Sequence, residues 1–316
     1  MRFITLCLIL FSFVFASGYE NPVLQYRASG AVVDMVIDEG RLYVATVESS
    51  VDIFDIKTAK LLDKIEVPRI KDFMGDIINS KIYSVDIDEN KIVILSQGNK
   101  GFRRVHMYEQ GSLKLLISNK DQLYMSKVRF LDKQTLVLGL LGNEILSYDI
   151  LKKAVNWRVQ VSQSKFSDLV LNEAKDEVVV SDESGDLKIL NTKNGKLLDT
   201  LSGQNLDNVF QVDYKNGIIA TAGQDRRVVV YDIENFSAYY ESAPFLIYSV
   251  GLSPSGKKVA YASDENNNVR VFDTKSKETL GQFTGNKMTL TKILFLNEKE
   301  FLVGSDDKII NLFQVK

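Results

Sequence analysis

One pair of residue types recurs along this chain at nearly constant spacing, and the repeat constrains the fold more than any other feature. Each pair has an aromatic or large apolar residue followed by a carboxylate or an amide. The pairs are Phe54-Asp55, Tyr108-Glu109, Tyr148-Asp149, Leu190-Asn191, Tyr231-Asp232, Phe272-Asp273 and Phe313-Gln314. Subtraction of neighbouring positions gives intervals of 54, 40, 42, 41, 41 and 41 residues. One structural unit of about 40–45 residues therefore repeats along the chain.

The residues within each unit favour β-strands. Segments such as Arg41–Thr46, Glu177–Val180 and Arg227–Tyr231 are rich in β-branched and aromatic residues. Four strands fit into one period, and a four-stranded sheet cannot bury both of its faces alone. Sheets that stack around an axis bury one another. We therefore predict an all-β protein, a seven-bladed β-propeller over residues 19–316, with six or eight blades as the alternatives.

The two ends of the repeat region predict how the ring closes. The last unit ends at Lys316, just after its third strand. The segment Asn21–Arg27 precedes the first full unit and is expected to supply the missing fourth strand. An N-terminal strand that closes the last blade would also pair strand edges that are otherwise exposed.

The first 16 residues have the pattern of a secretory signal peptide. Arg2 supplies a positive charge, Phe3–Phe15 is almost wholly apolar, and Val14 and Ala16 have the spacing that a signal peptidase reads. We expect cleavage after Ala16, with cleavage after Gly18 as the alternative. The apolar run is short for a membrane span, so an uncleaved anchor is the less favoured interpretation. An exported, soluble, periplasmic protein without a transmembrane segment is expected.

The composition offers little for catalysis or for nucleic-acid binding. Cys7 and His106 are the only residues of their types, so no cluster of thiols or imidazoles can hold a metal. Cys7 lies inside the apolar run, which argues against a lipoprotein. The chain has 39 basic and 41 acidic residues and no basic run longer than a pair, whereas phosphate binding needs a concentrated positive face. We expect no enzyme, no cofactor and no nucleic-acid partner.

Several segments resemble the WD40 family. Ile219–Asp232 and Leu302–Phe313 are similar to the second and third strands of that family's repeat. Leu252–Lys257 resembles its first turn, and Asn194–Gly203 resembles its third turn and outer strand. The resemblance covers nearly all of the chain after the signal and is weakest over residues 68–120. It implies a WD40-like propeller that binds partner proteins through its loops.

The sequence departs from the polar network that WD40 repeats often contain, which links His, Ser or Thr, Asp and Trp. Thr221, Asp225 and Tyr231 occupy three of these places, but Gly203-Gln204 and Gly285-Asn286 stand where Gly-His is usual. No unit has the full set. We therefore expect the blades to rely more on apolar packing, and we expect Thr221 and Asp225 to stabilise a turn.

Partner binding is expected on one face of the ring. In a WD40-like propeller, the loops from fourth to first strand and from second to third strand share a face, and loops commonly bind partners. Two insertions, Pro68–Ser80 and Gln97–Arg104, interrupt the repeat on that face. The candidate partner-binding residues there are Arg69, Phe73, Met74, Phe102, Arg103, Arg104, Arg226 and Phe245. An alternative role for Phe73 and Met74 is to cover the end of the first groove between blades.

The preferred function is a monomeric, non-catalytic scaffold or accessory protein. The short signal, the Lys-rich chain and the diverged repeats are together similar to accessory proteins of periplasmic nitrate reductases. That resemblance implies other periplasmic proteins as partners, among them a reductase complex. The alternative is a propeller-type hydrolase or lactonase with a metal in the central channel. A third interpretation is an outer-membrane assembly factor.

Overall fold

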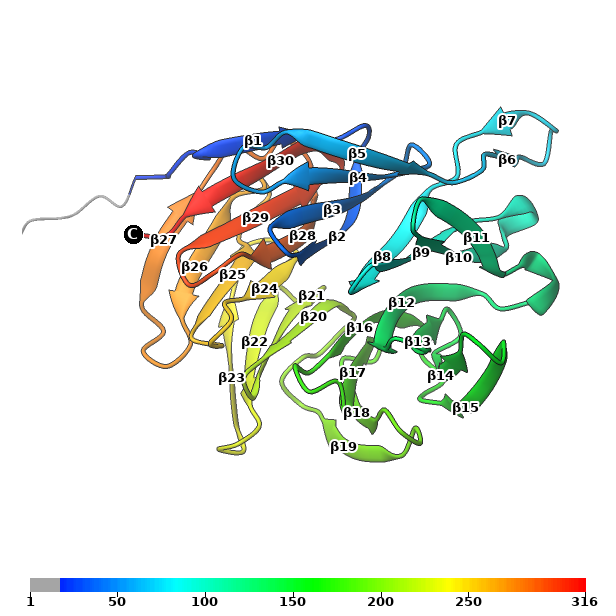
Figure 1. Ribbon diagram of the computed structural model, residues 1–316. Coiled ribbons are helices and arrows are strands. Elements are labelled where there is room, and N and C mark those ends of the chain that lie inside the picture. Colours follow the sequence, from blue (N-terminus) through cyan, green and yellow to red (C-terminus); the bar gives the residue numbers. More distant parts are fainter. Residues whose placement is uncertain (1–17) are drawn as a thin grey trace, which may run out of the picture.

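The computed structural model describes residues 18–316, so the predicted signal peptide over residues 1–16 lies outside the described residues. Strands in this part of the chain form seven four-stranded antiparallel sheets and one two-stranded sheet, with two 3-10 turns as the helical elements. The seven sheets stand around a common axis as the blades of a propeller (Figure 1). The all-β class and the count of seven blades are confirmed, and the alternatives of six and eight blades are wrong.

The blades are numbered here in chain order, each from its inner to its outer strand. Blade 1 comprises β2 (Val32–Asp38), β3 (Arg41–Thr46), β4 (Ser50–Asp55) and β5 (Leu61–Glu66). Blade 2 comprises β8 (Ile82–Asp88), β9 (Lys91–Gln97), β10 (Arg103–Glu109) and β11 (Ser112–Ile117). Blade 3 comprises β12 (Met125–Asp132), β13 (Thr135–Leu140), β14 (Glu144–Asp149) and β15 (Ala154–Gln160). Blade 4 comprises β16 (Phe166–Leu171), β17 (Glu177–Asp182), β18 (Leu187–Asn191) and β19 (Leu197–Leu201). Blade 5 comprises β20 (Val209–Lys215), β21 (Ile218–Gly223), β22 (Arg227–Asp232) and β23 (Ser237–Ser242). Blade 6 comprises β24 (Val250–Leu252), β25 (Lys258–Ala262), β26 (Val269–Asp273) and β27 (Thr279–Phe283). Blade 7 comprises β28 (Leu290–Phe295), β29 (Glu300–Ser305), β30 (Asp307–Gln314) and β1 (Leu24–Arg27).

The recurring residue pairs that predict the repeat all lie near the end of a third strand. Phe54-Asp55 ends β4, for example, and Tyr231-Asp232 ends β22. Phe54 and Tyr231 are buried, as are most of the apolar members of the other pairs. The spacing therefore recurs because each blade places one large side chain at the same point of the core.

The last blade takes its outer strand from the start of the described chain. β1 runs antiparallel to β30, with register from Leu24 opposite Leu312 to Arg27 opposite Ile309. Tyr26 on β1 is fully buried and packs edge-on against Phe54 of blade 1, with ring centroids 5.8 Å apart. β1 therefore contributes both a strand to blade 7 and an aromatic side chain to the packing between blades 7 and 1.

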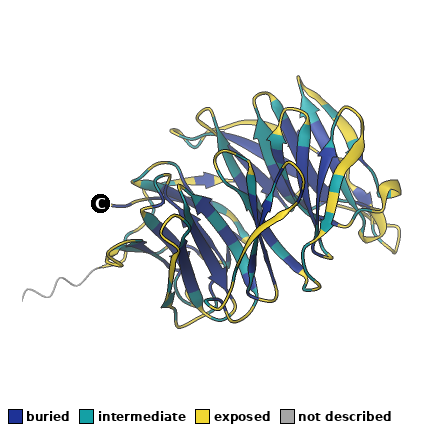
Figure 2. Ribbon diagram, turned by 90° about the horizontal axis from the view of Figure 1, so that it is seen from below, coloured by how far each residue is buried: buried dark blue, intermediate teal, exposed yellow. Residues whose placement is uncertain are grey.

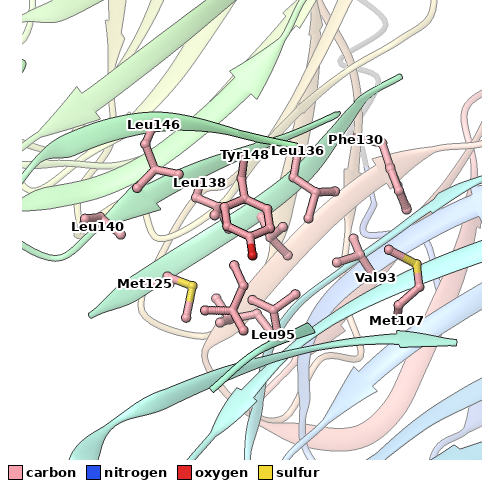
Figure 3. Packing of buried hydrophobic residues seen from close by; sticks show 13 residues of the cluster. Val93, Leu95, Met107, Met125, Phe130, Leu136, Leu138, Leu140, Leu146 and Tyr148 are labelled. Atoms are coloured by element: carbon pink, nitrogen blue, oxygen red, sulfur yellow. The ribbon is translucent and has the colours of Figure 1, made fainter. Parts of the chain in front are cut away.

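Apolar side chains from facing blades form the core. Between blades 2 and 3, Val93 and Leu95 face Leu136 and Leu138, and all four are fully buried (Figure 3). Each such side chain contributes roughly 1.5–3 kcal/mol through removal from water. Figure 2 shows that buried positions follow the strands, whereas exposed positions gather in the connections and on outer strands. The ring is thus a rigid base for its loops.

The antiparallel order of the strands divides the connections between two faces. Successive strands alternate in direction, so the outer-to-inner and the second-to-third connections lie at the same end of the blades. We call this end the top face and the other end the bottom face. No helix within residues 18–316 is long and apolar enough to cross a membrane.

Candidate protein-docking face

The first insertion folds into a hairpin that projects from the ring between blades 1 and 2 (Figure 1). Its strands are β6 (Ile70–Lys71) and β7 (Ile77–Ile78). The Asp72 carboxylate accepts hydrogen bonds from the backbone N–H groups of Met74 and Asp76, both at 2.9 Å, which closes the turn. Phe73 at the tip is 95% exposed and Met74 is 72% exposed. The alternative in which these two side chains cover the first groove is therefore wrong.

The base of the hairpin is held by the second insertion. The Arg104 guanidinium donates to the carbonyl oxygens of Pro68, at 2.8 Å, and Gln97, at 3.0 Å. The backbone N–H of Lys71 donates to the Asn99 side-chain oxygen at 3.0 Å. The two insertions therefore contact each other, and Arg104 acts mainly by fixing the hairpin in place.

Two aromatic residues that the sequence analysis did not single out complete this part of the face. Phe102 stacks on Tyr124, with ring centroids 5.4 Å apart and 23° between the ring planes. The Arg103 guanidinium lies 3.3 Å from the centre of the Tyr83 ring, a cation–π arrangement. Burial lowers the pKa values of Arg103 and Arg104. Tyr83 lies at the bulge of the inner strand of blade 2, where the extra residue changes the direction of the side chain.

The remaining two predicted residues lie on blades 5 and 6, apart from the hairpin. Arg226 is exposed in the second-to-third connection of blade 5, at a left-handed backbone position with φ of 63°. Phe245, in the connection between blades 5 and 6, contacts Tyr248, which stacks on Phe210 at 5.3 Å. The structure thus groups six of the eight predicted residues near blades 1 to 3 and leaves Arg226 and Phe245 in a second group on the same face.

Among the connections between strands, exposed large apolar side chains are more numerous on the top face than on the bottom face. Those in its connections are Phe73, Met74, Ile77, Ile78, Tyr124, Leu206, Phe245 and Met288. Those in the connections of the bottom face are Leu151 and Phe236. Eight residues against two is an asymmetry that packing of the ring does not require, because both faces close the same seven blades. Four of the eight, Phe73, Met74, Ile77 and Ile78, lie together on the hairpin, and clustered exposed apolar residues are typical of interaction surfaces.

The central channel contains a ring of polar side chains at equivalent positions of the inner strands. These residues are Asp34, Ser84, Lys127, Asp168, Gln211, Ser249 and Lys292. Asp34 pairs with Arg129, and Asp168 pairs with Lys127, each at 2.9 Å. Asp34 also accepts the backbone N–H of Val85 on the next blade, at 3.3 Å. Channel side chains therefore satisfy backbone groups on the free edges of inner strands, as they do at Val85, Val128 and Val212.

The electrostatics of the channel follow from these pairs. Burial alone would raise the pKa of Asp34, but the Arg129 guanidinium holds it well below its usual range. Burial raises the pKa of Asp86 and lowers the pKa of Lys292. Within residues 18–316, no three or more His, Cys, Asp or Glu side chains form a group that could hold a metal ion. The channel residues present do not fit the metal centre of the alternative hydrolase or lactonase.

His106 lies on the third strand of blade 2, where the sequence places it, and is buried. Burial and the nearby Arg104 lower its pKa to about 4. Its Nδ1 atom is 3.5 Å from the Ser96 hydroxyl. The residue is a neutral core side chain at physiological pH.

Blade 5 contains a polar network in addition to the apolar packing between the blades. The buried Asn205 side chain accepts a hydrogen bond from the Thr221 hydroxyl at 2.8 Å and donates to the Tyr231 hydroxyl at 3.2 Å. The Asn205 amide thus takes the part that a histidine imidazole plays in WD40 repeats. It lies one residue after Gln204, which stands at the usual histidine position. Asp225 accepts the backbone N–H groups of Leu206 and Arg227, so its predicted role in stabilising a turn agrees with the structure.

Comparison with known proteins identifies the fold and nothing finer. No protein-family model and no curated protein matches the sequence. The β-propeller domain of Cps50 (Swd1) from Myceliophteria thermophila matches with a TM-score of 0.74 at 13% identity, over 94% of this chain and 99% of that chain. The computationally designed Ika8 protein matches with a TM-score of 0.69 at 16% identity, over 94% of this chain and 100% of that chain. The protein has the fold of a seven-bladed β-propeller.

Proposed function

We propose that the protein is a non-catalytic scaffold that binds a partner protein on its top face. The observation that carries this proposal is the asymmetry between the two faces, with eight exposed large apolar side chains in the top connections and two in the bottom ones. Burial of such side chains against a partner stabilises a complex by roughly 25 cal/mol for each Å² of apolar surface. The bottom connections, with two dispersed exposed apolar residues, offer much less.

The polar channel supports a scaffold in preference to an enzyme. The two carboxylates of its ring of equivalent positions, Asp34 and Asp168, are neutralised by Arg129 and Lys127. Neither carboxylate is free to act as a base or as a metal ligand without loss of an ion pair that is largely buried. The channel therefore serves to hold the blades together, and the loops are left for binding.

We further propose that the scaffold works in the periplasm. The apolar segment and small residues of the first 16 positions support export. The short signal, the Lys-rich chain and the diverged repeats are together similar to the periplasmic nitrate-reductase accessory protein NapL. This similarity supports a reductase complex as the partner. Cell fractionation tests the location: the protein is expected in the periplasmic extract, and retention in the cytoplasm would contradict export.

Site-specific photo-cross-linking tests the binding face. A photoreactive phenylalanine analogue replaces Leu206 or Phe245 on the top face, or Leu151 or Phe236 on the bottom face, in the native host. The proposal expects the two top positions to cross-link the same protein and the two bottom positions to give none of it. Equal cross-linking from both faces, or none from the top face, would contradict the proposal.

A further inference from the structure

The inference below rests on the proposed function and specifies the chemistry of the partner. We propose that the hairpin surface, defined as residues 68–81, 97–104 and 118–124, binds an acidic protein segment that also presents apolar side chains. Three connections of the top face meet in this surface, and hydrogen bonds from Arg104 and Lys71 join two of them. Its charge, its exposed side chains and its unpaired polar atoms lead to the same class of ligand.

The hairpin surface is strongly positive in a chain with a formal net charge of −2. Its basic residues are Arg69, Lys71, Lys81, Lys100, Arg103, Arg104 and Lys120. Its acidic residues are Asp72, Asp76 and Asp121. Seven positive and three negative charges leave a net charge of +4 on these residues, and Glu48, whose carboxylate accepts a hydrogen bond from Asn79, adds one negative charge at the edge of the surface. A positive patch on an acidic protein attracts a negative partner and speeds their encounter.

Two of the three carboxylates on this surface are occupied in local turns. Asp72 accepts the two backbone N–H groups that close the hairpin. Asp121 accepts the backbone N–H of Ser118 at 2.7 Å and its hydroxyl at 2.9 Å. None of the seven cations takes part in an ion pair with another residue of the 18–316 segment. The positive charge is therefore available to a partner.

The two central arginines have unused hydrogen-bonding capacity. Nη1 of Arg103 and Nε of Arg104 are buried and have no hydrogen-bond partner among residues 18–316. These two nitrogens are out of reach of a partner, but a partly buried guanidinium without a carboxylate is costly, and the negative charge of a partner carboxylate beside its exposed part offsets that cost. A ligand with negative charge at this point would therefore be favoured over a neutral one.

The apolar side chains decide between a protein and a nucleic acid. Met74, Ile77 and Ile78 are 72%, 69% and 37% exposed, and Phe73 is 95% exposed. Three of these four are aliphatic, so they offer no stacking surface to bases and no contact to phosphates. Aliphatic and aromatic side chains of a peptide can bury them. An acidic segment with apolar residues satisfies both the charge and the exposed apolar side chains.

Peptide selection on the folded protein tests this inference. The probe is a phage-displayed library of random 16-residue peptides, selected against the chain without its first 16 residues. The expected enrichment is for Asp or Glu close to Phe, Leu, Ile or Val. Binding of the enriched peptides, measured by fluorescence anisotropy, should weaken by about tenfold with Phe73→Ser and by about the same with Arg69→Glu plus Lys71→Glu, and it should weaken with salt.

Matched controls lie on the bottom face. Phe236 is 94% exposed, so Phe236→Ser removes an aromatic ring as exposed as that of Phe73. Lys193 is exposed in a bottom connection, so Lys193→Glu reverses a charge far from the hairpin in the fold. Both controls should leave peptide binding within about twofold of the parent protein.

The outcomes separate this inference from the proposed function. Enriched peptides that are neutral or basic, or that bind Phe73→Ser as well as the parent, overturn the inference. If such peptides instead lose binding with Leu206→Ser or Phe245→Ser, the top face still binds proteins and the proposed function stands. Peptides that depend on no top-face residue contradict both. Binding of a 20-nucleotide single-stranded DNA more tightly than the peptides, lost with Arg69→Glu plus Lys71→Glu, would also overturn the inference.

Discussion

The hairpin surface and the central channel both gather charged residues, but they use them in opposite ways. In the channel, Asp34 and Asp168 each have a cation at 2.9 Å. On the hairpin surface the basic residues have no carboxylate partner within residues 18–316, and apolar side chains beside them are exposed. Under our proposal, a binding site is marked by unpaired charge that lies beside exposed apolar side chains, and not by charge alone.

The largest effect is expected in the channel. Arg129→Ala would leave the Asp34 carboxylate buried without its cation, and this should lower the free energy of unfolding by about 3–5 kcal/mol. Urea unfolding monitored by fluorescence measures it. The double variant Asp34→Asn plus Arg129→Met removes both charges and should lose less than the single variant. A single variant that costs under about 1 kcal/mol would mean that the channel pair is as dispensable as a surface pair.

A pH effect is expected from the core beneath the hairpin surface. His106 has a pKa of about 4 in the folded protein against 6.5 for the unperturbed group. Between these pH values the unfolded chain binds more protons, so stability falls as the pH drops from 6.5 to 4 and then loses nothing more from this residue. The loss should reach about 3 kcal/mol. His106→Gln should remove this part of the pH dependence, and equal pH profiles for variant and parent would contradict it.

A smaller effect is expected from the polar network of blade 5. Asn205→Ala removes the partner of the buried Thr221 hydroxyl and one partner of Tyr231. The free energy of unfolding should fall by about 2 kcal/mol, because a buried polar group is left unpaired. Thermal and urea unfolding measure it. Gln204→Ala, one residue earlier in the same loop, is the control and should cost less than half as much.

The smallest effect on stability is expected at the hairpin tip. Phe73 contributes almost nothing to the core at 95% exposure, so Phe73→Ser should change the free energy of unfolding by less than about 0.5 kcal/mol. The same urea experiment measures it. A loss above about 1 kcal/mol would show that the ring covers part of the fold, and the contrast between the two regions would fail.

The repeat predicted the ring because its physical cause is local. A large apolar side chain must occur once in every blade, so residues such as Phe54 and Tyr231 reveal the period without any knowledge of contacts. The hairpin insertion was found for the same reason, since it lengthens one interval. The exposure of the hairpin tip was not predictable, because the sequence is the same whether Phe73 and Met74 cover a groove or face water.

The channel and the network of blade 5 could not be predicted because their partners are distant in sequence. Arg129 and Asp34 lie two blades apart, and only closure of the ring brings them together. Asn205 was missed because an amide can replace an imidazole from a neighbouring position when the loop adjusts. Tyr124 was missed because it lies one residue before an inner strand, where an aromatic residue is expected in the core.

Two phenylalanines provide the most direct test of the docking face. Phe73 on the top face and Phe236 on the bottom face are 95% and 94% exposed, so replacement of either by serine removes the same ring from water. The measurement is the dissociation constant of the partner recovered by cross-linking, determined by calorimetry for both variants. The top-face account predicts weaker binding by about tenfold or more for Phe73→Ser and no change for Phe236→Ser. Equal affinity of the two variants, or a loss confined to Phe236→Ser, would contradict it.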